Sequence, residues 1–176
     1  MKTQDVLDIA IKMEEEGYDF YKQAESRTKD KFGKAMFSFL AEYEVHHKAL
    51  LERLKKNILP AAADLDIPLP KERLKSVFAE AKKNIGEHVP PTADDIKALD
   101  FGMEKEKESF RMYESAAKDA ESAAVKSMFL RMAAEEEEHY DILEKADIHD
   151  SFLYSLKLFW FNSWTHTTHS LWALTK

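Results

Sequence analysis

The chain has 176 residues, of which 44% are hydrophobic and 34% charged, so a packed core beneath a charged surface is expected. Its net charge of -7 argues against a nucleic-acid-binding protein, and the lack of cysteine excludes disulfides, thiolate nucleophiles, iron–sulfur clusters and cysteine-based zinc sites. The 4 glycines and 5 prolines are few for a turn-rich β protein and favour long helices.

Helical periodicity of the hydrophobic residues recurs in four long segments. The first covers about residues 3–28 and, after the interruption KDKFG, the second covers about residues 34–57. The third covers residues 92–119, and its start has the pattern of a capping box, Thr92 with Asp95. The fourth covers about residues 122–146, with Ser122 as the expected N-cap.

The connection between the second and third helices is long. It holds the proline-bearing stretch LPAAADLDIPLP, a short predicted helix over residues 71–84 and the break IGEHVPPT. Short links within each pair of helices and a long link between the pairs predict an all-α four-helix bundle with one crossover connection. We assign residues 1–150 to this bundle and residues 151–176 to a separate C-terminal arm.

The predicted arm differs in composition from the bundle. It holds all three tryptophans and no acidic residue, and polar residues such as Lys157 and His166 interrupt its apolar run, so it is not expected to span a membrane. We expect it to pack on the bundle or on a second subunit of a homodimer, with a membrane-surface segment as the alternative. The N-terminal stretch MKTQDVLDIA lacks an apolar signal core, which predicts a cytoplasmic protein.

The core-facing stripes of the four helices repeat. Steps of three and four residues along the second and fourth helices give two matching series in which His139 lies 92 positions after His47. The first and third helices match at the same offset. The series are Phe37, Leu40, Glu44, His47, Leu51 and Leu54 with Phe129, Met132, Glu136, His139, Leu143 and Ala146, and Leu7, Ala10, Glu14, Gly17, Tyr21 and Ala24 with Leu99, Gly102, Glu106, Ser109, Tyr113 and Ala116. The chain is therefore two copies of a helical hairpin.

Each stripe carries one glutamate, and two of the stripes carry a histidine three residues later on the same helical face. The six residues are Glu14, Glu44, His47, Glu106, Glu136 and His139. Within the run of glutamates at 135–138, Glu136 is predicted to point inward. Glu135, Glu137 and Glu138 fall off the stripe and are expected on the solvated surface.

The inward glutamates need a compensating positive charge. Buried carboxylates without partners are costly and raise one another's pKa, and no lysine or arginine lies on these stripes. Two divalent cations would balance the four carboxylates with both imidazoles neutral. Carboxylate and imidazole without thiolate suit two iron ions, with manganese or zinc as alternatives, and the pattern is that of di-metal carboxylate bundles.

Four stretches resemble the helices of a rubrerythrin-type member of the ferritin-like superfamily, over residues 3–147. They are MEEEGYDFYKQA, MEKEKESFRMYESA, LAEYEVHHKALLERL and MAAEEEEHYDILEKA. The resemblance implies a non-haem di-iron centre that reacts with hydrogen peroxide or dioxygen. We expect Glu14 and Glu106 as terminal ligands, Glu44 and Glu136 as bridging ligands, and His47 and His139 each completing one metal.

Two features depart from that family's pattern. Full-length rubrerythrins carry a four-cysteine rubredoxin domain, which this chain lacks, so electrons are expected from a separate donor such as a rubredoxin-like protein. Rubrerythrins also usually carry a further glutamate on the third helix, one turn from the first, whereas the neighbours of Glu106 on the stripe here are Ser109 and Met103. This difference argues against ligand switching by that carboxylate and weakens the case for efficient peroxidase chemistry.

Tyr21 and Tyr113 follow Glu14 and Glu106 on the same stripes. Each is expected either to hydrogen-bond a ligand carboxylate or to be an ordinary core tyrosine. The leading functional hypothesis is reduction of hydrogen peroxide or dioxygen in oxidative-stress defence. The alternatives are a ferroxidase that oxidises Fe(II) with dioxygen and a non-catalytic, metal-stabilised binding protein.

Overall fold

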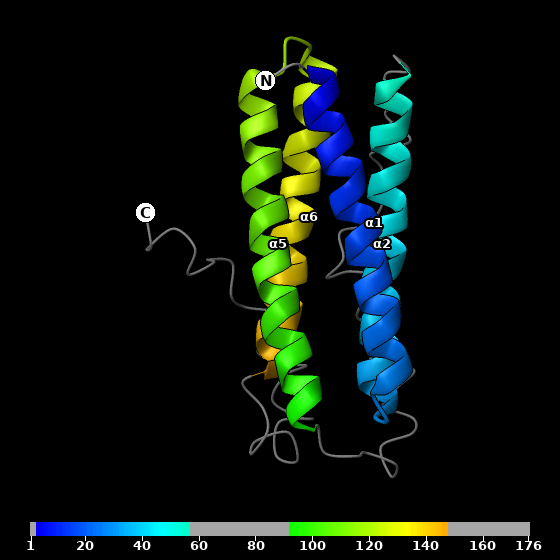
Figure 1. The fold of residues 1–176 in the computed structure, drawn as a ribbon. Coiled ribbons are helices and arrows are strands. Elements are labelled where there is room, and N and C mark those ends of the chain that lie inside the picture. The colour runs from blue at the N-terminus through cyan, green and yellow to red at the C-terminus, as the bar shows by residue number, and fades with distance from the viewer. Residues whose placement is uncertain (1–2, 57–91, 148–176) are drawn as a thin grey trace.

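The computed structural model describes residues 3–56 and 92–147 (Figure 1). These residues form α1 (Thr3–Arg27), α2 (Lys31–Lys55), α5 (Ala93–Asp119) and α6 (Ala123–Asp147), and they contain no strand. The predicted short helix at 71–84 and the predicted arm at 151–176 lie outside the described residues. No described helix holds an apolar stretch of the length needed to cross a membrane.

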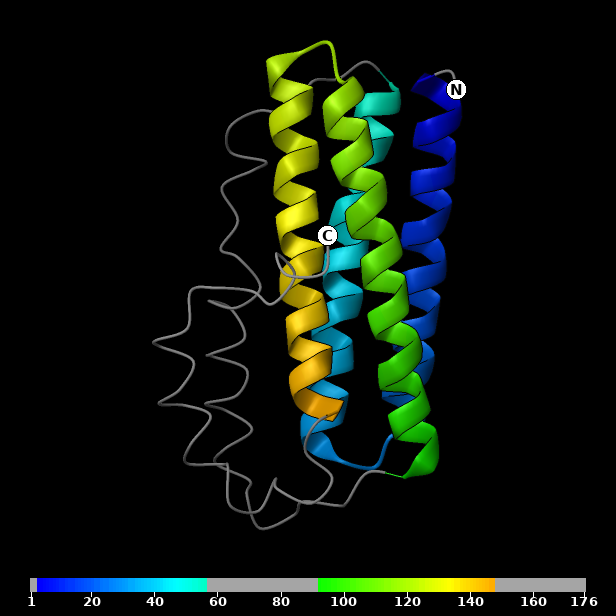
Figure 2. The same ribbon diagram turned by 90° about the vertical axis from the view of Figure 1, so that its left-hand side faces the viewer.

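The four helices lie side by side along their length (Figures 1 and 2). α1 packs on α2, α5 packs on α6, and α1 also contacts α5. α2 and α5 run in the same direction, so the end of α2 and the start of α5 lie at opposite ends of the bundle. This arrangement confirms the predicted all-α, ferritin-like bundle of two hairpins joined by one crossover.

The helix starts show how local chemistry sets the boundaries. The predicted capping box of α5 is confirmed, because Asp95 N donates to Thr92 Oγ1 at 3.3 Å and Thr92 N donates to Asp95 Oδ2 at 2.7 Å. α2 begins at Lys31, earlier than predicted, because the Asp30 carboxylate accepts a hydrogen bond from Gly33 N at 2.8 Å. The glycine in KDKFG therefore belongs to the first turn of α2 and does not break it.

Two apolar clusters fill the bundle, one toward each end. The first contains Tyr21, Ala24, Met36, Phe37, Phe39, Leu40, Ala41, Tyr43, Leu99, Ile142 and Leu143, and the second contains Leu7, Ala10, Leu50, Leu51, Tyr113, Ala117, Met128, Phe129, Met132 and Ala133. Because the predicted ligands come from the middle of each helix, they form a polar layer between these clusters. The clusters stabilise the bundle by burying apolar surface and separate this layer from the bundle ends.

We predict that Thr92→Ala lowers the free energy of unfolding by about 1 kcal/mol, because it removes the acceptor at the start of α5. Urea denaturation of the metal-free protein measures this change. Ser115→Ala, at an exposed site within the same helix, is the matched control and should leave stability the same or slightly higher. Equal stability of Thr92→Ala and the unmodified chain would contradict the capping role.

Candidate metal centre

The six predicted ligand side chains are all buried at the middle of the bundle. Glu44 is the most exposed of them, at 6%, and both histidines are completely buried. α1 and α5 each contribute one glutamate, and α2 and α6 each contribute a glutamate and the histidine one turn later. The buried side chains are Glu14, Glu44, His47, Glu106, Glu136 and His139.

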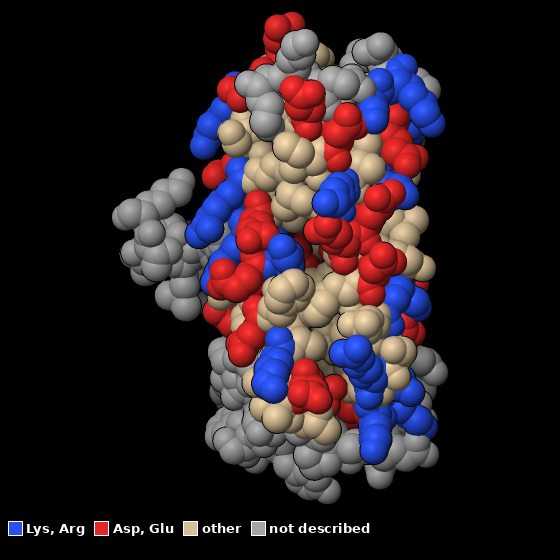
Figure 3. Space-filling model, in the orientation of Figure 1, with Lys and Arg blue, Asp and Glu red and all other residues tan. Residues whose placement is uncertain are grey.

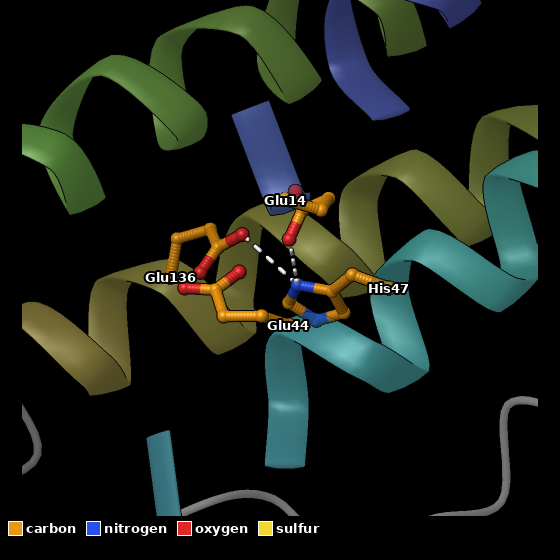
Figure 4. A group of neighbouring side chains, drawn as sticks. All are labelled: Glu14, Glu44, His47 and Glu136. Atoms are coloured by element: carbon orange, nitrogen blue, oxygen red, sulfur yellow. Dashed lines mark ion pairs between the residues drawn. The ribbon is translucent and has the colours of Figure 1, made fainter. Parts of the chain in front are cut away.

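These side chains form two overlapping groups. Glu14, Glu44, His47 and Glu136 offer ligand atoms that all lie within 4.8 Å of one another, and Glu106, Glu136 and His139 form a second such group. Glu136 belongs to both groups, as a bridging ligand would, while the predicted bridging role of Glu44 is not tested by this geometry. Figure 4 shows the first group, in which residues from α1, α2 and α6 converge.

Unpartnered polar atoms lie within these groups. Among the described residues, four buried side-chain atoms have no hydrogen-bond partner: Glu14 Oε2, His47 Nδ1, Glu136 Oε1 and His139 Nε2. The first three face one another, since His47 Nδ1 lies 3.4 Å from Glu14 Oε2 and 3.1 Å from Glu136 Oε1 (Figure 4). Because a buried polar atom without a partner is costly, a cation among these three atoms would satisfy them, so the residues fit a metal ion.

The carboxylates strongly perturb one another. Burial and the neighbouring Glu14 raise the pKa of Glu44 well above its ordinary value. Burial and the Glu136 charge raise the pKa of Glu106 to about 7. Burial lowers the pKa of His139, but Glu106 and Glu136 outweigh it and bring that pKa to about 9. Protons thus supply part of the compensating charge when no metal is bound.

Two tyrosines connect the hairpins at this layer. The Tyr21 hydroxyl, on α1, donates to Glu106 Oε1 on α5, and the Tyr113 hydroxyl, on α5, donates to Glu14 Oε1 on α1. Both rings are buried, and burial together with the Glu106 charge raises the pKa of Tyr21 well above its ordinary value. We expected each tyrosine either to hydrogen-bond a ligand carboxylate or to be an ordinary core residue, and the structure shows hydrogen bonds to the predicted ligands.

The prediction for Glu135 is wrong. The residue is 2% exposed, with Oε2 2.8 Å from His47 Nε2 and Oε1 2.6 Å from Arg131 Nε. The sequence analysis assigned only one row of residues on each helix to the core. The buried face of a bundle helix is wider than one row, so it also includes Glu135. Glu137 and Glu138 are half-buried.

A second row of core-facing residues on α6 could have predicted the burial of Glu135. Residues three and four apart along it are all buried, namely Met128, Met132, Glu135, His139 and Ile142. The equivalent row of α2 is also buried and contains Tyr43, which the sequence analysis likewise missed. The Tyr43 ring packs edge-on against His139, with the ring centroids 5.0 Å apart.

A small cavity between α1 and α5 reaches the ligand layer. Its volume is about 20 Å³, and its lining residues are Met13, Glu16, Gly17, Glu44, Lys105, Glu106 and Ser109. On the face of the bundle that Figure 3 shows, acidic and basic side chains are interspersed. Since one water needs roughly 10–15 Å³ by the same measure, the cavity admits a molecule of about that size. A larger depression of about 270 Å³, between α1 and α2, is lined by none of the predicted ligands.

We predict that metal affinity rises with pH through the range set by Glu106, near pH 7, and His139, near pH 9. Metal binding requires deprotonated ligands, and both groups have pKa values raised above their ordinary values, so lower pH retains competing protons. Titration calorimetry in buffers of different protonation enthalpy measures the protons released. An affinity that is flat across this range would contradict the assignment.

We predict that Gly17→Ala weakens metal binding. A Cβ at this position would lie 2.9 Å from Glu44 Cδ and Oε1, so the carboxylate must move. Ser109→Ala is the matched control at the equivalent position of α5, where a Cβ is already present, and it should bind metal normally. Equilibrium dialysis against Mn(II) measures both, and normal affinity in Gly17→Ala would show that Glu44 is not held where a metal needs it.

The sequence matches the family model described as Rubrerythrin over residues 5–147, which takes in almost all of the four described helices. No curated protein and no solved structure matches the chain.

Proposed function

This chain belongs to the rubrerythrin family, and we propose that it is a non-haem di-iron oxidoreductase that reduces hydrogen peroxide, or dioxygen, with electrons from a separate donor. The observation that carries the proposal is the set of four buried ligand carboxylates and two buried imidazoles, in which unpartnered atoms of Glu14, His47 and Glu136 face one another. A ligand set of this composition favours iron or manganese.

The six side chains divide between two metal positions. Glu14, Glu44 and His47 would hold one ion, Glu106 and His139 would hold the other, and Glu136 would contact both. Two ferrous ions bound there would supply the two electrons that reduction of hydrogen peroxide to two waters requires. Six side chains for two ions leave coordination positions for a small oxidant.

The surrounding residues orient the ligands and limit access. Tyr21 and Tyr113 each fix one carboxylate oxygen, which leaves the other oxygen of Glu106 and of Glu14 for the metal. The cavity beside Gly17 and Ser109 supports entry of a molecule of about the size of peroxide or dioxygen. Its small volume argues against organic hydroperoxides as substrates.

The electron donor is proposed to be a separate protein, such as a rubredoxin-like one. The chain has no cysteine with which to bind an iron centre of the rubredoxin type. Electrons for each turnover must therefore reach the buried centre from outside the chain.

A ferroxidase is the second candidate, and Ser109 favours it. This residue lies on the cavity wall one turn after Glu106, and rubrerythrins usually carry a further glutamate one turn from the first, so here the ligand set would be limited to six side chains. A centre of that kind can also oxidise Fe(II) with dioxygen for storage or detoxification.

Stopped-flow reoxidation of the Fe(II)-loaded protein tests the proposal. Hydrogen peroxide should reoxidise the centre faster than dioxygen does. Faster reaction with dioxygen would assign the ferroxidase function, and stable ferrous protein in both oxidants would leave a metal-stabilised binding protein.

We predict that Glu136→Ala abolishes binding of both metal ions and all oxidant reactivity, because this carboxylate belongs to both groups. Glu44→Ala should also lose metal and activity. Metal content after anaerobic loading measures the effect. Glu137→Ala is the matched control, one residue away but outside both groups, and equal loss in that variant would contradict the assignment.

A further inference from the structure

The duplication of the hairpin breaks down at two positions beside the ligands. On α6 these positions hold Arg131 and Glu135, and the equivalent positions of α2 hold Phe39 and Tyr43. Both 135 and 43 are buried, and each side chain contacts the histidine of the opposite hairpin. One histidine thus meets a carboxylate that is paired with an arginine, and the other meets an aromatic ring.

His47 is held at the ring nitrogen that faces away from the other ligands. Its Nε2 lies 2.8 Å from Glu135 Oε2, and Arg131 Nε donates to the other oxygen of Glu135 at 2.6 Å. Because an ionised carboxylate only accepts hydrogen bonds, Nε2 carries the proton. Nδ1 is the ring nitrogen that faces the centre, 3.1 Å from Glu136 Oε1, and it would offer its lone pair to a metal bound there.

His139 has no such support. Its Nδ1 lies 2.9 Å from Glu136 Oε2 and 3.6 Å from Glu106 Oε2, so the same ring nitrogen faces the ligands. Its buried Nε2 has no hydrogen-bond partner among the described residues, and the Tyr43 ring packs edge-on against it. The two imidazoles thus occupy equivalent positions but differ at the nitrogen that faces away from the metal.

We propose that the two metal positions are inequivalent, and that Glu135, held by Arg131, is the positioning residue that makes the His47 position bind metal first and more tightly. This inference rests on the two-metal centre of the proposed function. A carboxylate on the far nitrogen fixes the ring orientation and makes the imidazole a stronger donor, and loss of such a partner typically costs 10- to 100-fold in metal affinity.

Anaerobic Co(II) titration of the full chain tests the proposal, because cobalt reports coordination without redox chemistry. The unmodified chain should bind two equivalents in two steps, the first roughly 10-fold or more tighter. In ring-labelled protein titrated with diamagnetic Zn(II), the first equivalent should shift the His47 resonances before those of His139. His139→Ala should keep the tight step, and His47→Ala should lose it.

Variants of Glu135 and Arg131 test whether this pair causes the difference in metal affinity between the two positions. Glu135→Ala should weaken the first step by roughly 10- to 100-fold and leave the second unchanged, so that the two steps merge. Glu135→Gln keeps an oxygen that can accept from Nε2 and should restore part of the difference, which a merely structural role would not predict. Glu137→Ala is the matched control and should titrate like the unmodified chain. If Glu135→Ala does not fold, Glu135→Gln and Arg131→Ala carry the test, with an intermediate loss expected from each.

The possible results distinguish a failure of this inference from a failure of the proposed function. Equal affinities in the unmodified chain would overturn the inequivalence, and a tight step that survives both Glu135 substitutions would overturn the role of Glu135; neither result would contradict the proposed function. Two-step binding without any reaction with peroxide or dioxygen would overturn the oxidoreductase and support the inequivalence. A chain that binds no metal would overturn both.

Discussion

The burial of the four predicted ligand carboxylates in one layer of the bundle is the constraint on which the rest of the structure depends. No lysine or arginine of the core-facing stripes neutralises them, and apolar clusters pack on both sides of the layer. In such surroundings an uncompensated charge is prohibitively costly. Burial and neighbouring carboxylates raise the pKa values of Glu44 and Glu106, so protons would offset part of this cost without metal, and two divalent cations would offset it more completely.

The duplicated hairpin provides the geometry that this constraint requires. Each copy places a glutamate on its first helix and Glu-x-x-His on its second, so two copies close a six-residue shell. The crossed hydrogen bonds of Tyr21 and Tyr113 then link α1 with α5 through the ligands themselves. The departure from symmetry at Glu135 is what allows the two halves of the centre to differ in metal affinity.

Much of this site was predictable because it obeys two regular patterns. Helical spacing places Glu14, Glu44 and His47 on core-facing stripes, and the 92-residue repeat places their counterparts. The burial of Glu135 was not predicted, because a glutamate inside a run of glutamates is expected on the surface unless its partners are known. Its partners are Arg131 on the same helix and His47 on another helix. The pairing of each tyrosine with the opposite hairpin depends on tertiary packing, which periodicity does not specify. The earlier start of α2 depended on a single cap, Asp30.

Anaerobic equilibrium dialysis against Fe(II) tests the central claim most directly, because charge compensation by a metal pair fixes the stoichiometry. The account predicts two ferrous ions per chain, with a melting temperature that rises on loading because the ions bind the folded state. A chain that stays metal-free under saturating Fe(II), with unchanged thermal stability, would contradict it.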